Sequence, residues 1–215
     1  ASVVSDCRNE DISALTQLTE GCTFVTLIAD TPEIGCVEVN DRMQLGIYGS
    51  TATPTGLQAQ FYVTGADALL WLSNVRVQGR QNTGDCGGGC INGGAIFLQD
   101  CSSVVILACE FIGNEAGDGI QTHANVPAGY GGAITAWGGT VVVRDSTFRD
   151  NLAHDHTGSI FINGRIHLSG STFSGSISRA NGMPANTAFS IYNGGHYSDN
   201  EATGLDVKNA GGPMQ

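Results

Sequence analysis

The sequence predicts an all-β, single-domain parallel β-helix, a solenoid in which each repeat forms one coil. Two motifs recur in phase: Gly-Gly-Ala-Ile at residues 93–96 and 131–134, and Phe-x-x-Asn at residues 111–114 and 148–151. A third, eroded copy runs from residue 158 to residue 176. Internal repetition with a period of a few tens of residues is typical of solenoids.

The spacing of the motifs divides the repeat into a fixed half and a variable half. From the Ile of the first motif to the Phe of the second there are 15, 14 and 13 residues, whereas the distance from each Phe to the next Ile ranges from 12 to 23. Strand-like runs fill the fixed half at residues 95–98, 104–107 and 109–111, with Gly, Asp or Asn between them. No helical period and no leucine-rich pattern intervenes, so a parallel β-helix is favoured.

Stacked coils give the motif residues structural roles. Equivalent side chains in coils ~4.8 Å apart lie on top of one another, so we expect Phe111, Phe148 and Phe173 to form an interior column. Asn114 and Asn151 are expected at a turn, where each amide bonds its own backbone and the Asn of the next coil. The paired glycines are expected to supply positive φ angles at tight corners.

The chain divides into three segments. Residues 1–22 are expected to form an N-terminal cap, with a short amphipathic helix that begins near residues 9–11 and covers the open end of the solenoid. One face of this helix carries Ile12, Leu15 and Leu18. Residues 23–202 are assigned to the parallel β-helix, and residues 203–215 to a C-terminal tail rich in Gly.

Composition excludes several classes of protein. The chain has 215 residues, of which 41% are hydrophobic and 13% charged, so a core is expected rather than disorder. Its net charge of −11, with Lys208 as the single lysine, excludes nucleic acid as a partner. No run of 18 apolar residues is present, so no transmembrane segment is expected. No metal signature such as HExxH occurs, and we predict neither a metal nor a cofactor.

The cysteines point to an oxidising compartment. All seven fall within the first 109 residues, and at least two disulfides are expected. The candidates for pairing are Cys7, Cys22 and Cys36 in one group and Cys86, Cys90, Cys101 and Cys109 in the other. The chain also begins with Ala1 rather than Met, as after removal of a targeting peptide. We therefore expect a secreted, cell-surface or other extracytoplasmic location, such as an organelle lumen.

At residues 60–176 the motifs resemble the repeats of the polymorphic outer membrane protein (Pmp) family, which are defined by GGA-I/L/V and FxxN signatures. More broadly they are similar to the right-handed parallel β-helices of the pectin-lyase-like group. The resemblance implies a right-handed coil and a secreted or surface-exposed scaffold, often adhesive or structural and usually without catalysis. The third copy departs from the pattern. Gly158-Ser159-Ile160 is read as lacking the second Gly, and Ser176 replaces the Asn, so the ladder is expected to weaken there.

Candidate binding residues lie in the variable halves, at residues 79–93, 113–132, 150–159 and 176–188. These segments follow the same turn in each coil and are expected to emerge from one edge of the solenoid. The candidates on this edge are Asp118, His123, Tyr130, His154, Asp155 and His156. The two imidazoles at 154 and 156, with His123 or Asp118, could hold a transition metal or act as acid and base on a sugar. A solvated turn is the favoured reading of this triplet.

Two functions follow from the sequence. The first is a non-catalytic extracytoplasmic β-helix scaffold for binding or adhesion, with a protein partner or surface glycan, or with a place as accessory subunit in a larger assembly. The alternative is a polysaccharide lyase or uronate epimerase that acts on an acidic glycan. Candidates for that chemistry are Arg144, Arg149 and Arg165 with Asp145 and Asp150, although no lyase or epimerase signature surrounds them. We favour the scaffold and assign no catalytic residue.

Overall fold

A computed structural model describes most of the chain. The described residues are 8–10, 20–31, 33–50, 52–79, 81–82, 93–117, 129–154, 157–179, 187–191, 195–198, 201–203 and 206–209. Within these ranges the protein is all-β, every pairing of strands is parallel, and no helix is long and apolar enough to cross a membrane. The prediction of an all-β chain is confirmed.

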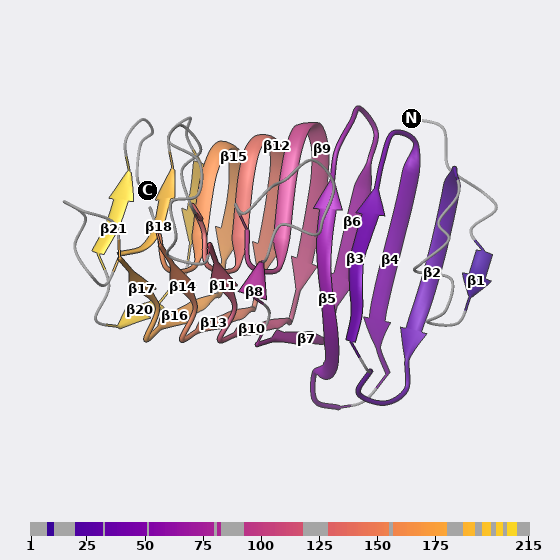
Figure 1. Cartoon of the computed structure of the whole chain (residues 1–215), viewed down its shortest axis with the longest axis horizontal. Coiled ribbons are helices and arrows are strands. Elements are labelled where there is room, and N and C mark those ends of the chain that lie inside the picture. The colour runs from indigo at the N-terminus through magenta and orange to yellow at the C-terminus, as the bar shows by residue number, and fades with distance from the viewer. Residues whose placement is uncertain are drawn as a thin grey trace.

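The chain passes through the same faces again and again, and successive passages lie side by side along the longest axis of the molecule (Figure 1). One passage, or coil, runs through β9 (Ile96–Leu107), β10 (Glu110–Ile112) and β11 (Glu115–Ala116) before β12 (Ile134–Arg144) pairs with β9. The predicted strands at 95–98 and 104–107 are the two halves of β9, which bends at Asp100, where φ is 61°. The short strand β11 was not predicted.

The strands form two sheets. The large sheet contains β1 (Arg8–Glu10), β2 (Gly21–Leu27), β3 (Glu33–Val39), β4 (Met43–Gly49), β5 (Thr55–Val63), β6 (Leu69–Ser73), β7 (Val75–Gln78), β9, β10, β12, β13 (Thr147–Arg149), β15 (Ile160–Ser169), β16 (Thr172–Ser174), β18 (Thr187–Ile191), β19 (Gly195–Ser198), β20 (Glu201–Thr203) and β21 (Asp206–Asn209). The small sheet contains β8 (Gln81–Asn82), β11, β14 (Leu152–Ala153) and β17 (Ile177–Ser178).

Aromatic rings stack through the interior. Phe111 pairs in register with Val77, Phe148 and, through β13, with Phe173. The ring centroids of Phe111 and Phe148 lie 4.9 Å apart at 3°, and those of Phe148 and Phe173 lie 4.9 Å apart at 9°. All three side chains are fully buried. One column of rings therefore ties three coils together.

An amide ladder runs beside this column. The Nδ2 of Asn114 donates to the carbonyl of Val77 and to Oδ1 of Asn151, each at 3.1 Å, and the backbone N–H of Asn114 donates to the same Oδ1 at 3.0 Å. The Nδ2 of Asn151 in turn donates to the carbonyl of Phe111 at 3.0 Å. The backbone N–H of Asn151 donates to Oγ of Ser176, so Ser176 continues the ladder in the next coil.

A second ladder, which was not predicted, crosses the corner before β10, β13 and β16. The N–H of Cys109 donates to Oγ of Ser146 at 3.1 Å, and the N–H of Ser146 donates to Oγ of Ser171 at 3.2 Å. Hydroxyl groups in these positions satisfy backbone donors that would otherwise be buried without a partner.

The structure gives the paired glycines a different role from the one predicted. None of Gly93, Gly94, Gly131 and Gly132 is among the residues with positive φ. They are instead required because neighbouring backbones meet there: a Cβ on Gly132 would lie 2.0 Å from the carbonyl oxygen of Gly158. These glycines permit close approach rather than a left-handed corner.

The third copy also aligns differently from the prediction. Ile134 pairs with Ile160 and Gly131 with Thr157, so it is the first Gly that is replaced and Gly158 holds the second position. Ser159 then stands where the other copies have Ala, and its Oγ lies 2.6 Å from Oγ of Ser176. The two departures from the motif are therefore paired with each other.

In this region each described coil has two corners at which one residue adopts the left-handed backbone conformation, with positive φ. One corner is formed by Asn74, Ala108, Asp145 and Gly170, with φ between 50° and 58°. The other is formed by Gly79, Gly113, Asp150 and Gly175, with φ between 55° and 62°. Gly, Asn and Asp are the residue types that tolerate this conformation best.

Both ends of the chain depart from the prediction. Arg8–Glu10, where the helix was expected to begin, is strand β1 and pairs with β2. The expected helical residues Ile12, Leu15 and Leu18 lie outside the described residues. The expected tail at 203–215 includes β21, which pairs with β18.

The cysteines agree with the prediction only in part. Cys22 and Cys36 are disulfide-bonded, whereas Cys101 and Cys109 are free thiols, which corrects the expectation that these two take part in pairing. Cys109 is buried, and its Sγ donates to the carbonyl of Leu107 at 3.2 Å. Cys101 is exposed at the bend of β9. Which cysteines are joined stays a prediction.

Candidate functional site

The predicted binding edge begins at the small sheet. Glu115, Leu152 and Ile177 are paired in register on its outer side, while Ala116, Ala153 and Ser178 are buried on its inner side. The chain leaves the sheet after these strands and returns at the bridges that join Gly93, Gly131 and Thr157. The variable segments therefore start and end at equivalent places in neighbouring coils.

Glu115 and His154 form a hydrogen-bonded pair on this edge. The Nε2 of His154 lies 2.7 Å from Oε1 of Glu115, and the side chains are 10% and 30% exposed. The backbone N–H of His154 donates to the carbonyl of Ala116 at 3.2 Å. The pair joins two coils, so the expectation that His154 is a solvated turn residue is wrong. A carboxylate that fixes one ring nitrogen leaves the other able to accept or donate a proton.

Tyr130, the other predicted binding residue in the described part, is a packing residue. Its side chain is 8% exposed and contacts Phe161, with centroids 4.7 Å apart, and the edge of Trp137 at 5.0 Å. Its carbonyl accepts hydrogen bonds from the N–H of Thr157 at 2.6 Å and from the hydroxyl of Thr157 at 3.2 Å. Tyr130 thus fixes the point where the chain re-enters the coil.

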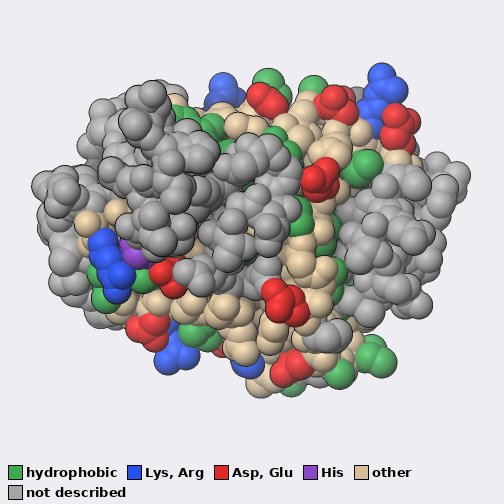
Figure 2. Space-filling model, in the orientation of Figure 1, with side chains coloured by type: hydrophobic (Ala, Val, Ile, Leu, Met, Phe, Trp, Pro, Cys, Tyr) green, Lys and Arg blue, Asp and Glu red, His purple; other side chains and the backbone are tan. Residues whose placement is uncertain are grey.

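The remaining predicted binding residues, Asp118, His123, Asp155 and His156, lie outside the described residues. Within the described ranges, no group of three or more His, Cys, Asp or Glu side chains is placed to hold a metal ion. Figure 2 shows acidic side chains scattered singly over one face rather than gathered at one point.

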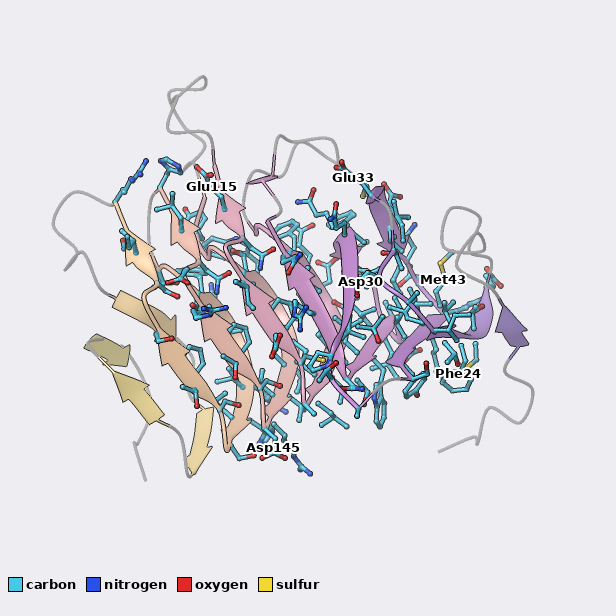
Figure 3. The ribbon with its side chains drawn as sticks, turned by 90° about the horizontal axis from the view of Figure 1, so that it is seen from below. Phe24, Asp30, Glu33, Met43, Glu115 and Asp145 are labelled. Carbon is cyan, nitrogen blue, oxygen red and sulfur yellow. The ribbon has the colours of Figure 1, made fainter. Side chains whose placement is uncertain are left out.

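Two of the side chains considered for lyase or epimerase chemistry serve the turns of the coils. Asp145 and Asp150 occupy left-handed corners, and their Oδ1 atoms lie where a Cβ would stand on the corner glycines of the next coil, 2.3 Å from that place at Gly170 and 2.1 Å at Gly175. Arg149 lies 3.8 Å from Asp150, with both side chains more than half exposed. Figure 3 shows Asp145 and Glu115 on opposite sides of the coils, so these two carboxylates do not belong to one site.

An ion pair joins two coils on the face that contains β7 and β10. The Nε of Arg76 lies 2.6 Å from Oε2 of Glu110, its partner in register. This hydrogen bond to Glu110 is the main reason that the pKa of Arg76 is raised. Both side chains are about a third exposed, and no reaction is implied by the pair.

A further feature of the described surface was not predicted. Six adjacent strands (β2, β4, β6, the second half of β9, β12 and β15) form one face of the coils. Leu72, Ile106 and Val143 are buried on its inner side, so the alternate residues point outward. Its outward side carries half-buried apolar residues, which we call the apolar band: Phe24, Tyr48, Leu69, Trp71, Val105, Leu107 and Val142.

Register makes the apolar band continuous. One column across the six strands reads Phe24, Gly46, Trp71, Val105, Val142, His167. The sequence carries a signal for the band, because the strands at 70–72, 104–107 and 141–143 are apolar on both faces instead of alternating. An antiparallel or one-sided strand would show polar residues at every second position.

Local packing flattens the band. The ring of Phe24 lies across Gly46, where a Cβ would be only 2.5 Å from the ring, and its centroid is 5.6 Å from that of Tyr48. Burial raises the pKa of Tyr48. The Nε1 of Trp71 is enclosed and has no hydrogen-bond partner. A buried donor without a partner typically costs about 1–3 kcal/mol, so this tryptophan is not placed there by stability alone.

Comparisons of the chain with protein-family models, with curated proteins and with solved structures gave no match.

Proposed function

We propose that this chain is a right-handed parallel β-helix with Pmp-like repeats that serves as a non-catalytic extracytoplasmic binding scaffold, in the manner of an accessory subunit of a larger assembly. The observation that carries the proposal is the apolar band, which extends over five adjacent strands of one face, from β2 to β12. A contiguous apolar surface of this kind marks a site of protein contact. A protein is accordingly the favoured partner over a surface glycan.

The interior supports this role because it makes the band rigid. The column of Phe111, Phe148 and Phe173 and the ladder of Asn114 and Asn151 hold neighbouring coils in one register. A surface that is ordered before binding loses little conformational entropy when a partner docks. Rigid strands therefore suit a scaffold better than they suit a closing enzyme.

The extracytoplasmic location rests on the cysteines. All seven lie within the first 109 residues, and Cys22 and Cys36 are disulfide-bonded. Disulfides persist in secreted and lumenal proteins and are rare in reducing compartments.

Recruitment into the native assembly tests the scaffold proposal. Tagged wild-type protein and the variants Val105→Asp and Val142→Asp are added to an extract of the source cells and separated by size under native conditions. We expect the wild type to enter a complex larger than itself and the two band variants to be lost from it. Ile177→Asp is the matched control, because Ile177 is 45% exposed on the small sheet, away from the band. Equal recruitment of all four proteins would contradict the proposal.

The Glu115–His154 pair supports the alternative function, an enzyme acting on an acidic glycan, because a carboxylate-oriented imidazole can serve as a general base. Incubation with polyuronates would reveal a lyase by its unsaturated product and an epimerase by exchange of the C5 proton. We expect neither activity from the wild type. Product that disappears in His154→Ala but persists in Ile177→Asp would replace the scaffold proposal with the enzyme.

A further inference from the structure

Two of the four described cysteines form disulfides, and the other two are thiols. Cys22 lies on β2 and Cys36 on β3, and each is disulfide-bonded. Cys101 and Cys109 are free. Since the chain has seven cysteines, Cys22 and Cys36 are bonded either to each other or to two of the remaining three, which are Cys7, Cys86 and Cys90.

The register of the strands keeps Cys22 and Cys36 apart. Cys22 pairs with Gln44 of β4, which therefore marks the place of Cys22 in the next coil. Cys36 precedes Gln44 by eight residues, and the corner at residues 40–42 lies between them. At ~3.3 Å per residue, even a sharp corner of about 60° leaves the Cα atoms of Cys36 and Gln44 more than ~10 Å apart. The Cα atoms of a disulfide lie within about 7 Å of each other, so Cys22 and Cys36 belong to two different bonds.

We propose that Cys22 is joined to Cys7 and Cys36 to Cys90, so that two disulfides fasten the first coils and Cys86 keeps a free thiol. Cys7, Cys86 and Cys90 lie outside the described residues, and the assignment rests on the register of the strands that adjoin them. The inference goes beyond the proposed function and does not depend on the apolar band.

The pairing of β1 with β2 brings Cys7 to Cys22. Arg8 pairs with Thr23 in parallel, and Cys7 and Cys22 directly precede these two residues. Neighbouring strands lie ~4.8 Å apart, and equivalent side chains of parallel strands stand on the same side. This spacing falls within the range of Cα separations found in disulfides, roughly 4.4–6.8 Å. Continuation of the register by one residue is therefore enough to form the bond.

A hydrogen bond between coils brings the segment before β9 towards Cys36. Cys36 pairs in register with Gln60 of β5, and Cys36 faces outward because its neighbour Val37 is buried on the inner side. The Nε2 of Gln60 donates to the carbonyl of Gly93 at 3.1 Å. The chain therefore approaches β9 beside the residue that is paired with Cys36.

The distance along the chain favours Cys90 over Cys86 as the partner of Cys36. Cys90 precedes Gly93 by three residues, and Cys86 precedes it by seven. Three residues span up to ~10 Å, which is enough to pass from Gly93 over Gln60 to Cys36, one strand spacing of ~4.8 Å further on. Because Gly93 is held by Gln60, closing the shorter segment costs less conformational entropy than closing the longer one.

Both proposed bonds involve strands that precede the buried ladders. The aromatic column begins at Phe111, and the amide ladder reaches back to the carbonyl of Val77. Strands β1, β2 and β3 come before both of these residues in the chain. Disulfides at these strands restrict the unfolded chain, and so they stabilise coils that the two ladders do not reach.

Peptide mapping of the wild-type protein tests the assignment without any variant. The purified chain is unfolded in urea with N-ethylmaleimide at about pH 6, where few thiols are ionised and disulfides exchange slowly. Digestion without reduction, by trypsin and a Glu-specific protease, places Cys7, Cys22 and Cys36 in separate peptides, which are 1–8, 21–33 and 34–38. The other four cysteines stay in peptide 81–110.

We expect peptide 1–8 to be linked to 21–33, and peptide 34–38 to be linked to 81–110. Fragment spectra of the second pair should show maleimide on Cys86, Cys101 and Cys109. A link between 21–33 and 34–38, or between 1–8 and 34–38, would overturn the assignment. Maleimide on Cys90 in place of Cys86 would overturn the choice of Cys90.

Cysteine variants test whether the bonds fasten the coils. Cys7→Ser and Cys36→Ser should each lower the urea midpoint of unfolding, and each should add one thiol to those that react in the unfolded, unreduced protein. Cys101→Ser is the matched control, since Cys101 is free and exposed, and its midpoint should equal that of the wild type. Midpoints of Cys7→Ser and Cys36→Ser that also equal the wild type would show that the bonds do not stabilise the first coils.

Discussion

The side-chain amide of Asn114 donates to the amide oxygen of Asn151 at 3.1 Å across two neighbouring coils. Both side chains are fully buried, and both also bond backbone groups of other residues. The pair therefore satisfies polar groups from three coils at a corner that water does not reach.

Removal of the Asn151 side chain should destabilise the fold strongly. Asn151→Ala removes the side-chain acceptor of the N–H of Asn114 and a side-chain donor to the carbonyl of Phe111, both buried, and we expect a loss of about 2–4 kcal/mol in the free energy of unfolding. Asn151→Ser should lose less, because Ser176 fills this position in the next coil. Urea unfolding checks both, with the outward Thr147→Ala as control. Equal losses in Asn151→Ala and Thr147→Ala would show that the ladder contributes nothing.

Phe148 is the middle ring of the aromatic column, and its removal should destabilise the fold strongly. Phe148→Ala removes a ring that is stacked on both faces, and about 3–5 kcal/mol of stability should be lost. Phe148→Leu keeps most of the volume and should lose clearly less. Thermal and urea unfolding measure the difference. A cost for Phe148→Ala below about 1 kcal/mol would mean that the coils collapse around the gap.

Substitution by Ala should destabilise the protein at both Gly132 and Gly113, but for different physical reasons. Gly132→Ala places a Cβ 2.0 Å from the carbonyl oxygen of Gly158 and should prevent normal stacking of the coils. Gly113 has φ of 62°, and a Cβ added there would meet nothing within 4 Å, so Gly113→Ala should cost only about 1–2 kcal/mol of backbone strain. Circular dichroism and yield of folded protein compare them. A well-folded Gly132→Ala beside a misfolded Gly113→Ala would reverse the assignment.

The two free thiols should differ in reactivity. Burial raises the pKa of Cys109 from 9.0 to about 11, whereas Cys101 is exposed. At pH 8 iodoacetamide should therefore label Cys101 in the native protein and Cys109 only after unfolding, as mass spectrometry would show. The thiol of Cys109 favours the folded state fully below pH 9.0, and this contribution falls as the pH rises towards about 11. Rapid native labelling of Cys109 would contradict its burial.

The near-constant length of the fixed half explains which parts of the fold could be predicted from the sequence. The stack of Phe111 and Phe148 and the pairing of Asn114 with Asn151 follow once the fixed halves are aligned, since a parallel register repeats every side chain at the same place. The predicted strands of the fixed half follow from the same alignment. Two of them join into β9, because a bend at Asp100 does not interrupt the pairing with β12.

Other features depend on contacts that spacing does not contain. The crowding at Gly132 arises from the backbone of a residue in another coil, so positive φ was the wrong reason for the glycine. The third copy looks like an eroded motif in the sequence. In the structure its two departures, Ser159 and Ser176, are hydrogen-bonded to each other and so compensate each other. The apolar band was not predicted because an apolar strand such as 104–107 reads simply as core, whereas loops and charged residues draw attention to the edge.

Of the six predicted binding residues, the structure describes two. Tyr130 is buried against Trp137 and Phe161, and His154 is paired with Glu115. Sequence spacing predicted that both lie on one edge, but only the neighbouring coil determines whether such a side chain is available to a ligand.

The equivalence of Asn114 and Asn151, 37 residues apart, makes the stretch between them a cassette. The residues that precede them, Gly113 and Asp150, share a left-handed backbone, with φ of 62° and 55°. A gene rearrangement that removed or duplicated residues 114–150 would therefore rejoin the chain at matching geometry and keep the same kinds of buried neighbour. The protein could lengthen or shorten in whole increments, so that its reach evolves independently of the chemistry of its ends.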